Sequence, residues 1–240
     1  MKLKRFLSLL LVLCCLLTLL PMGALPVQAT EPEGTVFTGS IPFQVNPLYA
    51  DIIDVCTLNI TPPAPPIATC SEVFYVSESA GAATLRSAMV ARDTYAEINY
   101  ITTNPDIKQS IYDLFAESLV HTGNPSEGDY LLYTYGGFSV SYTYHISNGE
   151  YYVSSWFDLT YNTTASQEAE MDKAVDRLLA QLDLADNTDY QKISTIYDYI
   201  TANVRYDYDH LNNDNYSLMY TAYAALVNKA AVCEGYANLF

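Results

Sequence analysis

The chain has 240 residues, of which 27 are acidic and 11 are basic, and half of all residues are hydrophobic. A protein this acidic repels phosphate backbones, which argues against nucleic acid as a partner. The 22 Tyr, 8 Phe and 1 Trp argue against intrinsic disorder, because so many large apolar rings can build a core.

The N-terminus has the pattern of a secretory signal peptide. Basic residues within 1–5 precede an apolar run over 6–20, and Val27 and Ala29 are the small residues that a signal peptidase reads. The run is too short for a stop-transfer helix, and no later segment reaches the roughly 20 apolar residues of a membrane span. Cleavage after Ala29 would leave 211 residues with eight basic and 27 acidic side chains, a charge of −19. We therefore expect a secreted or envelope-associated protein without a transmembrane segment in its mature chain.

Three of the five cysteines would remain after cleavage. Cys56 and Cys70 flank the Pro-rich stretch 61–66, and they would form a disulfide in an oxidising compartment if that stretch loops back. The alternative is that all three cysteines stay reduced. In either case Cys233 is an unpaired thiol, which raises the question of its reactivity.

The first predicted elements are a leader, a helix, a strand and a second helix. Residues 30–79, rich in Pro, Thr and Gly, are expected to form an extended leader. Apolar residues recur at helical spacing over 80–93, which predicts a helix. Polar and apolar residues alternate over 94–102, which predicts a strand. Asn104 is interpreted as an N-cap, with Pro105 at the first position of the next helix.

Three Tyr-rich runs follow and are predicted to be the strands of an antiparallel meander. They span 130–135, 138–146 and 150–161, and an Asn-Gly pair at 148–149, a strong hairpin signal, separates the last two. Alternating tyrosines on such strands suggest carbohydrate stacking, but half-buried sheet faces are the simpler interpretation. Together with the preceding helices, these strands predict an α+β module.

The pattern then becomes helical. Thr164 and Thr188 each stand three residues before a glutamine, which is capping-box spacing, and each opens a helix with one apolar face. A third helical stretch is predicted over 216–227, and Cys233 stands in the first turn of a fourth. Unpaired N–H groups and the positive end of the helix dipole favour a nucleophilic thiolate there. By itself, however, a cysteine at an apolar helix start is more often a buried small residue.

Four blocks in this part of the chain carry a family resemblance, at 196–200, 203–207, 220–226 and 231–237, the last reading Ala-Val-Cys-Glu-Gly-Tyr-Ala. In this order the blocks resemble the transglutaminase-like superfamily over roughly 165–240, and a looser likeness reaches back to about residue 80. The resemblance implies a papain-like Cys-His-Asp triad with Cys233 as its nucleophile. The thiolate would attack an amide carbonyl to form a thioester, which water or an amine resolves.

The resemblance also implies an exported bacterial member that is interrupted just after its nucleophile. The superfamily's His and Asp lie on strands after the cysteine helix, whereas seven residues follow Cys233 here. We therefore expect the helical half of a domain whose sheet is missing, without appreciable activity. His121, His145 and His210 all precede the cysteine and are interpreted as structural or solvated.

No cofactor and no metal ion are expected. Asp207 starts an oxygen-rich loop, but Asn212 and Leu218 stand where an EF-hand needs a glycine and an acidic residue, so the loop is interpreted as solvated. Phosphate-loop and zinc-site spacings are also absent from the sequence.

We therefore predict an exported α+β protein of four parts: signal peptide 1–29, leader 30–79, α+β module 80–163 and partial transglutaminase-like domain 164–240. Its complete form would attack a peptide or isopeptide amide through Cys233, as a protease or an acyltransferase. Its substrates would be proteins or peptides, with cell-wall peptide as one candidate. The alternative is a non-catalytic binding or scaffold module of the cell envelope that keeps a degenerate form of this fold.

Overall fold

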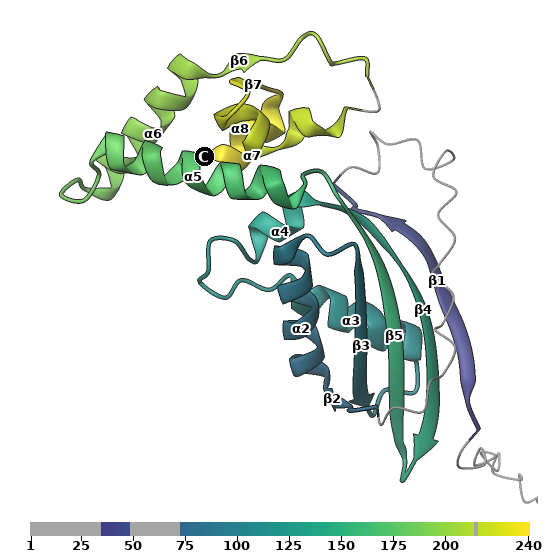
Figure 1. Cartoon of the computed structure of the whole chain (residues 1–240). Helices are drawn as coiled ribbons and strands as arrows, with labels where there is room; N and C mark the ends of the chain where they lie inside the picture. Colours follow the sequence, from purple (N-terminus) through teal and green to yellow (C-terminus); the bar gives the residue numbers. More distant parts are fainter. Residues whose placement is uncertain (1–34, 49–72, 214–215) are drawn as a thin grey trace, which may run out of the picture. The chain divides into compact units, whose positions relative to one another are not determined.

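The computed structural model describes residues 35–48, 73–213 and 216–240, which all belong to one unit of the chain, Glu33–Phe240 (Figure 1). The predicted signal peptide and the predicted disulfide partners Cys56 and Cys70 lie outside the described residues. Among the helices of the described part, none is long and apolar enough to cross a membrane. The described part is α+β, as the sequence predicted.

A mixed five-stranded sheet is the framework of the first region, and its strand order is β1-β4-β5-β3-β2. The strands are β1 Phe37–Val45, β2 Val76–Ser77, β3 Tyr95–Thr102, β4 Tyr135–Ser147 and β5 Glu150–Tyr161. Neighbours are antiparallel except β2, which pairs in parallel with β3. β4 and β5 form the predicted hairpin. Asn148 and Gly149 at its two-residue turn have φ of 53° and 82°, as a left-handed Asn-Gly turn requires.

Helices α2, Glu78–Ala91, and α3, Ile107–Ser118, pack with this sheet around one hydrophobic core (Figure 1). Leu85 of α2, Ile111 of α3 and Phe157 of β5 are fully buried in that core. Tyr100 of β3 is buried as well, and its hydroxyl lies 3.0 Å from the Ser110 hydroxyl of α3. Burial raises the pKa of Tyr100 far above its ordinary value, so the phenol stays neutral within the core.

The first of the three runs predicted as meander strands is instead a helix, α4, Asp129–Thr134. Its buried residues, Leu131 and Thr134, are three apart, which is a helical spacing rather than the alternation of a strand. The Thr134 hydroxyl also donates to the Tyr130 carbonyl oxygen at 2.7 Å, one helical turn back. The prediction of a strand over 130–135 was therefore wrong. It relied on the high tyrosine content of this run, whereas the spacing of its buried residues is helical.

Two further differences concern the leader and the start of α3. Residues 37–45 of the predicted leader pair with β4 as the edge strand β1. The N-cap of α3 is Asp106, whose carboxylate accepts from the Gln109 N–H at 3.1 Å, and not Asn104 as predicted. Asn104 instead accepts from the Asp106 N–H at 3.0 Å, so its side chain shapes the turn before the helix.

The second region is helical and begins with α5, Ala165–Leu182, and α6, Asp189–Asn203. Both start with the predicted capping boxes, at Thr164 and Thr188. The remaining elements are β6 Arg205–Tyr206, the 3-10 helix η2 Ser217–Tyr220, α7 Ala222–Leu226, β7 Ala230–Ala231 and α8 Cys233–Leu239.

The stretch 216–227 was predicted as one helix, but it is divided between η2 and α7. The division falls at Thr221, which is in an extended conformation and caps α7 by accepting from the Ala224 N–H at 3.2 Å. The absence of a larger sheet covering these helices stays a prediction.

Candidate nucleophile site around Cys233

Cys233 follows a short parallel ladder of two strands, β6 and β7 (Figure 1). Arg205 lies opposite Ala230 and Tyr206 opposite Ala231, and the Asp207 N–H extends the ladder by donating to the Ala231 carbonyl oxygen at 3.0 Å. Because the two strands are parallel, the loop after Asp207 and the helix that starts at Cys233 leave from the same end of the ladder. In parallel sheets, ligands bind outside this carboxyl end of the strands.

Cys233 is the first residue of α8, and it is exposed and free. The preceding Val232 is buried, and its N–H donates to the Met219 carbonyl oxygen at 3.0 Å. The predicted helix start is therefore confirmed, and the alternative that Cys233 is a buried small residue is wrong. The thiol stands at the rim of a packed strand-to-helix turn, which is where a nucleophile must be to meet a substrate.

Gly235 has a packing role that explains its place two residues after the cysteine. A Cβ atom at this position would lie 2.6 Å from the Ala231 Cβ, 2.9 Å from the Met219 carbonyl oxygen and 3.0 Å from the Thr221 carbonyl oxygen. Two of these atoms belong to the backbone and can move only if η2 and α7 shift. A residue without a side chain therefore lets α8 approach β7, η2 and α7 this closely.

Two polar side chains of α8 fasten the helix in place. The Tyr236 hydroxyl donates to the Val204 carbonyl oxygen at 2.6 Å, and the Asn238 amide donates to the Tyr220 carbonyl oxygen at 2.9 Å. Burial, followed by the nearby Tyr208, raises the pKa of Tyr236 above its ordinary value. The phenol therefore stays protonated and can donate at neutral pH. Gly235 and Tyr236 of the sequence motif thus both hold the helix that carries the thiol.

A histidine–carboxylate pair lies in the loop that follows β6. Asp207 is only 2% exposed, and both of its carboxylate oxygens lie 2.8–2.9 Å from His210 Nδ1. The His210 ring stacks on Tyr216 with centroids 4.0 Å apart. The interpretation of Asp207 as part of a solvated loop was therefore wrong. The sequence signal that could have found this pair is an aspartate three residues before a histidine at a strand end.

The other two histidines lie in the first region. His145 is in β4 and stacks on Tyr152 of β5 with centroids 5.0 Å apart, and His121 is exposed after α3. Of the three histidines, His210 alone is in the helical region with Cys233. Within the part of the chain that the structure describes, no group of three or more His, Cys, Asp or Glu could hold a metal ion.

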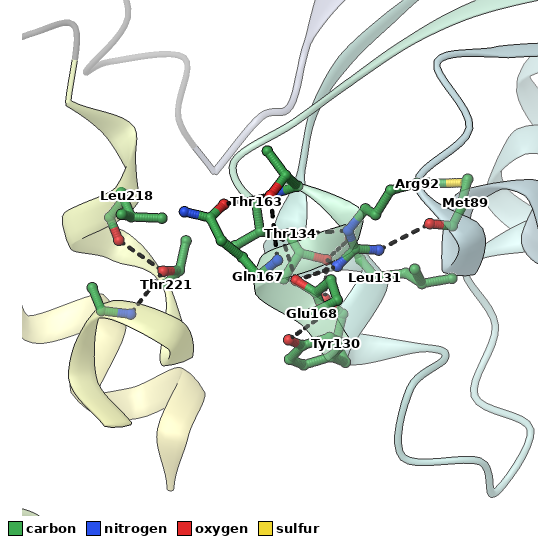
Figure 2. A network of polar contacts seen from close by, with 12 residues as sticks. Met89, Arg92, Tyr130, Leu131, Thr134, Thr163, Gln167, Glu168, Leu218 and Thr221 are labelled. Atoms are coloured by element: carbon green, nitrogen blue, oxygen red, sulfur yellow. Dashed lines mark hydrogen bonds and ion pairs between the residues drawn. The ribbon is translucent and has the colours of Figure 1, made fainter. Parts of the chain in front are cut away.

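A buried arginine connects the first region to α5, the helix that follows β5 (Figure 2). Arg92, the C-cap of α2, has a left-handed backbone with φ of 60°. Its guanidinium lies 3.0 Å from a carboxylate oxygen of Glu168 and donates to the hydroxyls of Thr134 at 3.1 Å and Thr163 at 3.3 Å. Glu168 also accepts from the Tyr130 hydroxyl at 2.8 Å. Every member of this network therefore has a partner, as buried charges require.

Helix α5 in turn packs against α7, next to the nucleophile helix. Met171 of α5 shares a hydrophobic cluster with Tyr223 and Leu226 of α7. The Tyr223 hydroxyl donates to Glu170 at 2.7 Å, and this bond is the main reason why the pKa of Tyr223 is raised. A continuous set of contacts thus leads from α2 through α5 to the elements that support Cys233.

Residues 176–240 match the family model of the transglutaminase-like superfamily. This part of the chain belongs to the transglutaminase-like superfamily. The match spans α6, both ladder strands and α8, so it confirms the membership that the sequence motifs indicated. No curated protein and no solved structure matches the chain.

In this transglutaminase-like segment, the arrangement provides an exposed thiol at a helix start and an oriented imidazole after the neighbouring strand. A thiol can attack an electrophilic carbon once it is deprotonated. The catalytic role of Cys233 and the disulfide between Cys56 and Cys70 stay predictions.

Proposed function

We propose that this protein carries the nucleophile-bearing half of an exported thiol enzyme that acts on peptide or isopeptide amides, with Cys233 as its nucleophile. The observation that carries the proposal is the exposed thiol at the first residue of α8, inside the segment that matches the superfamily. The tight seating of α8 through Gly235 and Tyr236 supports it, because a nucleophile is effective only when its position is fixed.

In the proposed reaction the Cys233 thiolate forms a bond to the amide carbonyl carbon, and the carbon–nitrogen bond breaks. The amine leaves with the proton that the thiol gave up, and the acyl group stays on sulfur as a thioester. Water then gives hydrolysis, whereas a second amine gives transfer. The backbone N–H of Cys233 would donate to the oxyanion that forms during the attack.

The proposed substrates are proteins or peptides met outside the cytoplasm, including cell-wall peptide. Support for export comes from the signal-peptide pattern over 1–29. The surplus of 27 acidic over 11 basic side chains disfavours polyanions and is compatible with neutral or basic peptides.

The first test measures the reactivity of the thiol. The rate of Cys233 alkylation by iodoacetamide at pH 7 is followed by peptide mapping and compared with the rate of a free peptide that carries residues 229–237. We expect Cys233 to react at least about tenfold faster, because the proposed nucleophile has to be more reactive than a free thiol. Mapping distinguishes Cys233 from Cys56 and Cys70.

The second test looks for the acyl intermediate. The protein is incubated with neutral amide and isopeptide substrates, and intact-mass spectrometry looks for an acyl adduct that Cys233→Ala lacks. A thiol no more reactive than the free peptide, together with no adduct, would count against the enzyme. That result would favour the alternative of a non-catalytic binding or scaffold module.

A further inference from the structure

We propose that His210 contacts the peptide substrate beside Cys233, and that the buried Asp207 holds its imidazole in position for that contact. This inference rests on the proposed function and identifies a second residue of the same site. His210 would be a substrate-binding residue and Asp207 a positioning residue that acts through it.

The first observation is that the His210 ring is fixed on two sides. The buried Asp207 accepts from Nδ1–H, with both carboxylate oxygens within 2.9 Å, and the ring stacks on Tyr216. A carboxylate accepts hydrogen bonds only, so the shared proton sits on Nδ1. An imidazole held in this way has lost its rotational freedom before any substrate binds, which reduces the entropic cost of binding.

The second observation is that the other ring nitrogen remains for a ligand. Among the described residues, the hydrogen bonds of the His210 ring are made by Nδ1, and its side chain is 37% exposed. A purely structural histidine gains most when both nitrogens are satisfied inside the protein. Here one nitrogen is clamped by a buried carboxylate, and Nε2 can meet a peptide carbonyl or N–H.

The third observation is the place of this loop in the fold. The loop with His210 and the helix with Cys233 start from adjacent parallel strands, β6 and β7, and leave from the same end. The Asp207 N–H is bonded to Ala231, two residues before the thiol. A peptide that crosses this end of the ladder with its carbonyl at Cys233 would therefore pass the loop that carries His210.

The surroundings favour a neutral peptide as the substrate. Tyr206 packs against Tyr208 with ring centroids 4.9 Å apart and against Tyr236 at 6.5 Å, and Tyr208 is 73% exposed. The charged Arg205 and Asp209 pair with each other at 3.2 Å. Exposed tyrosine rings offer apolar contact together with hydrogen-bonding edges, which suits an extended peptide backbone.

The test compares two alkylating probes with the same reactive group, iodoacetamide and a neutral iodoacetyl tripeptide amide. The measured quantity is the second-order rate constant of the tripeptide probe at Cys233 divided by that of iodoacetamide. This ratio is then divided by the same ratio for a free cysteine peptide. In the unaltered protein we expect a ratio above one, because the tripeptide makes contacts that the small probe lacks. His210→Asn keeps a donor for Asp207 but removes Nε2, and we expect it to lower the ratio about threefold to tenfold, as the loss of one hydrogen bond does.

Asp207→Asn should also lower the ratio, because His210 remains in the sequence but loses the carboxylate that holds its ring. His145→Asn, in β4, should leave the ratio unchanged, and thermal melting checks that each variant is folded. A ratio of one in the protein without substitutions would overturn the proposal. The same ratio in His210→Asn as in that protein would also overturn it. Equal slowing of both probes would also overturn it, since His210 would then act on the thiol and not on the peptide. The iodoacetamide rate alone reports activation of Cys233, so failure of the proposed function is seen separately.

Discussion

The sheet region, residues 73–163 with β1, and the helical region, residues 164–240, bury their apolar residues to different degrees. Almost all of the large side chains that are fully buried lie in the sheet region, among them Tyr100, Phe157 and Leu114. Among the described residues of the helical region, Met219 is the only such side chain. The two longest helices, α5 and α6, bury one residue each, Met171 and Ile200.

The difference shows two ways of holding structure. The sheet region is stabilised by a large contiguous core, and such cores tolerate little change in volume. In the helical region the nucleophile helix is held by a close backbone approach at Gly235 and by side-chain hydrogen bonds to carbonyl groups. Apolar side chains on α6, such as Ile193 at 53% exposed and Tyr197 at 59%, contribute little to a core in the described part of the chain.

The largest expected effect tests the core of the sheet region. Phe157→Ala should lower the free energy of unfolding by about 3–5 kcal/mol, because it leaves a cavity between β5 and α3. The matched change Ile193→Ala, on the exposed face of α6, should cost no more than about 0.5 kcal/mol. Urea denaturation followed by fluorescence of the single tryptophan, Trp156, measures both. Equal losses for the two variants would remove the contrast between the regions.

A smaller effect is expected at the connection between the regions. Arg92→Met should cost about 3 kcal/mol, because it leaves the Glu168 carboxylate largely buried without its cation. The double variant Arg92→Met with Glu168→Gln should recover part of that loss, since no unpaired charge remains. Urea denaturation of the single and double variants, with hydrogen exchange of the α5 amides, measures the connection. A loss below about 0.5 kcal/mol for the single variant would show that the regions are stabilised independently of this ion pair.

The smallest expected effect concerns the seating of the nucleophile helix. Gly235→Ala should cost about 1–2 kcal/mol, since overpacking against backbone atoms outweighs the helix propensity gained with alanine. Hydrogen exchange at the Tyr236 amide should speed up while exchange in β4 and β5 stays the same. Ala237→Ser, on the exposed side of α8, is the control and should change little. Unchanged exchange in Gly235→Ala would mean that α8 has room that the contact distances do not indicate.

Signals that act over a few residues were readable in the sequence. The capping boxes at Thr164 and Thr188, the Asn148-Gly149 turn and the helix start at Cys233 each depend on residues within four positions of one another. The errors arose where a distant contact decided the outcome. Strand β1 exists because it pairs with β4, about 100 residues away, and nothing local in a Pro- and Thr-rich stretch indicates that pairing.

The sequence by itself determined the family, the position of the thiol and the starts of α5, α6 and α8, because these depend on short motifs whose chemistry is local. Only the tertiary structure decided that Asp207 is buried against His210, that Gly235 lies against two carbonyl oxygens, and that Arg92 meets Glu168. Each of these contacts depends on how separate elements pack. Burial determines whether a polar or small residue is solvated or part of a tightly packed site, and burial is a property of the whole fold.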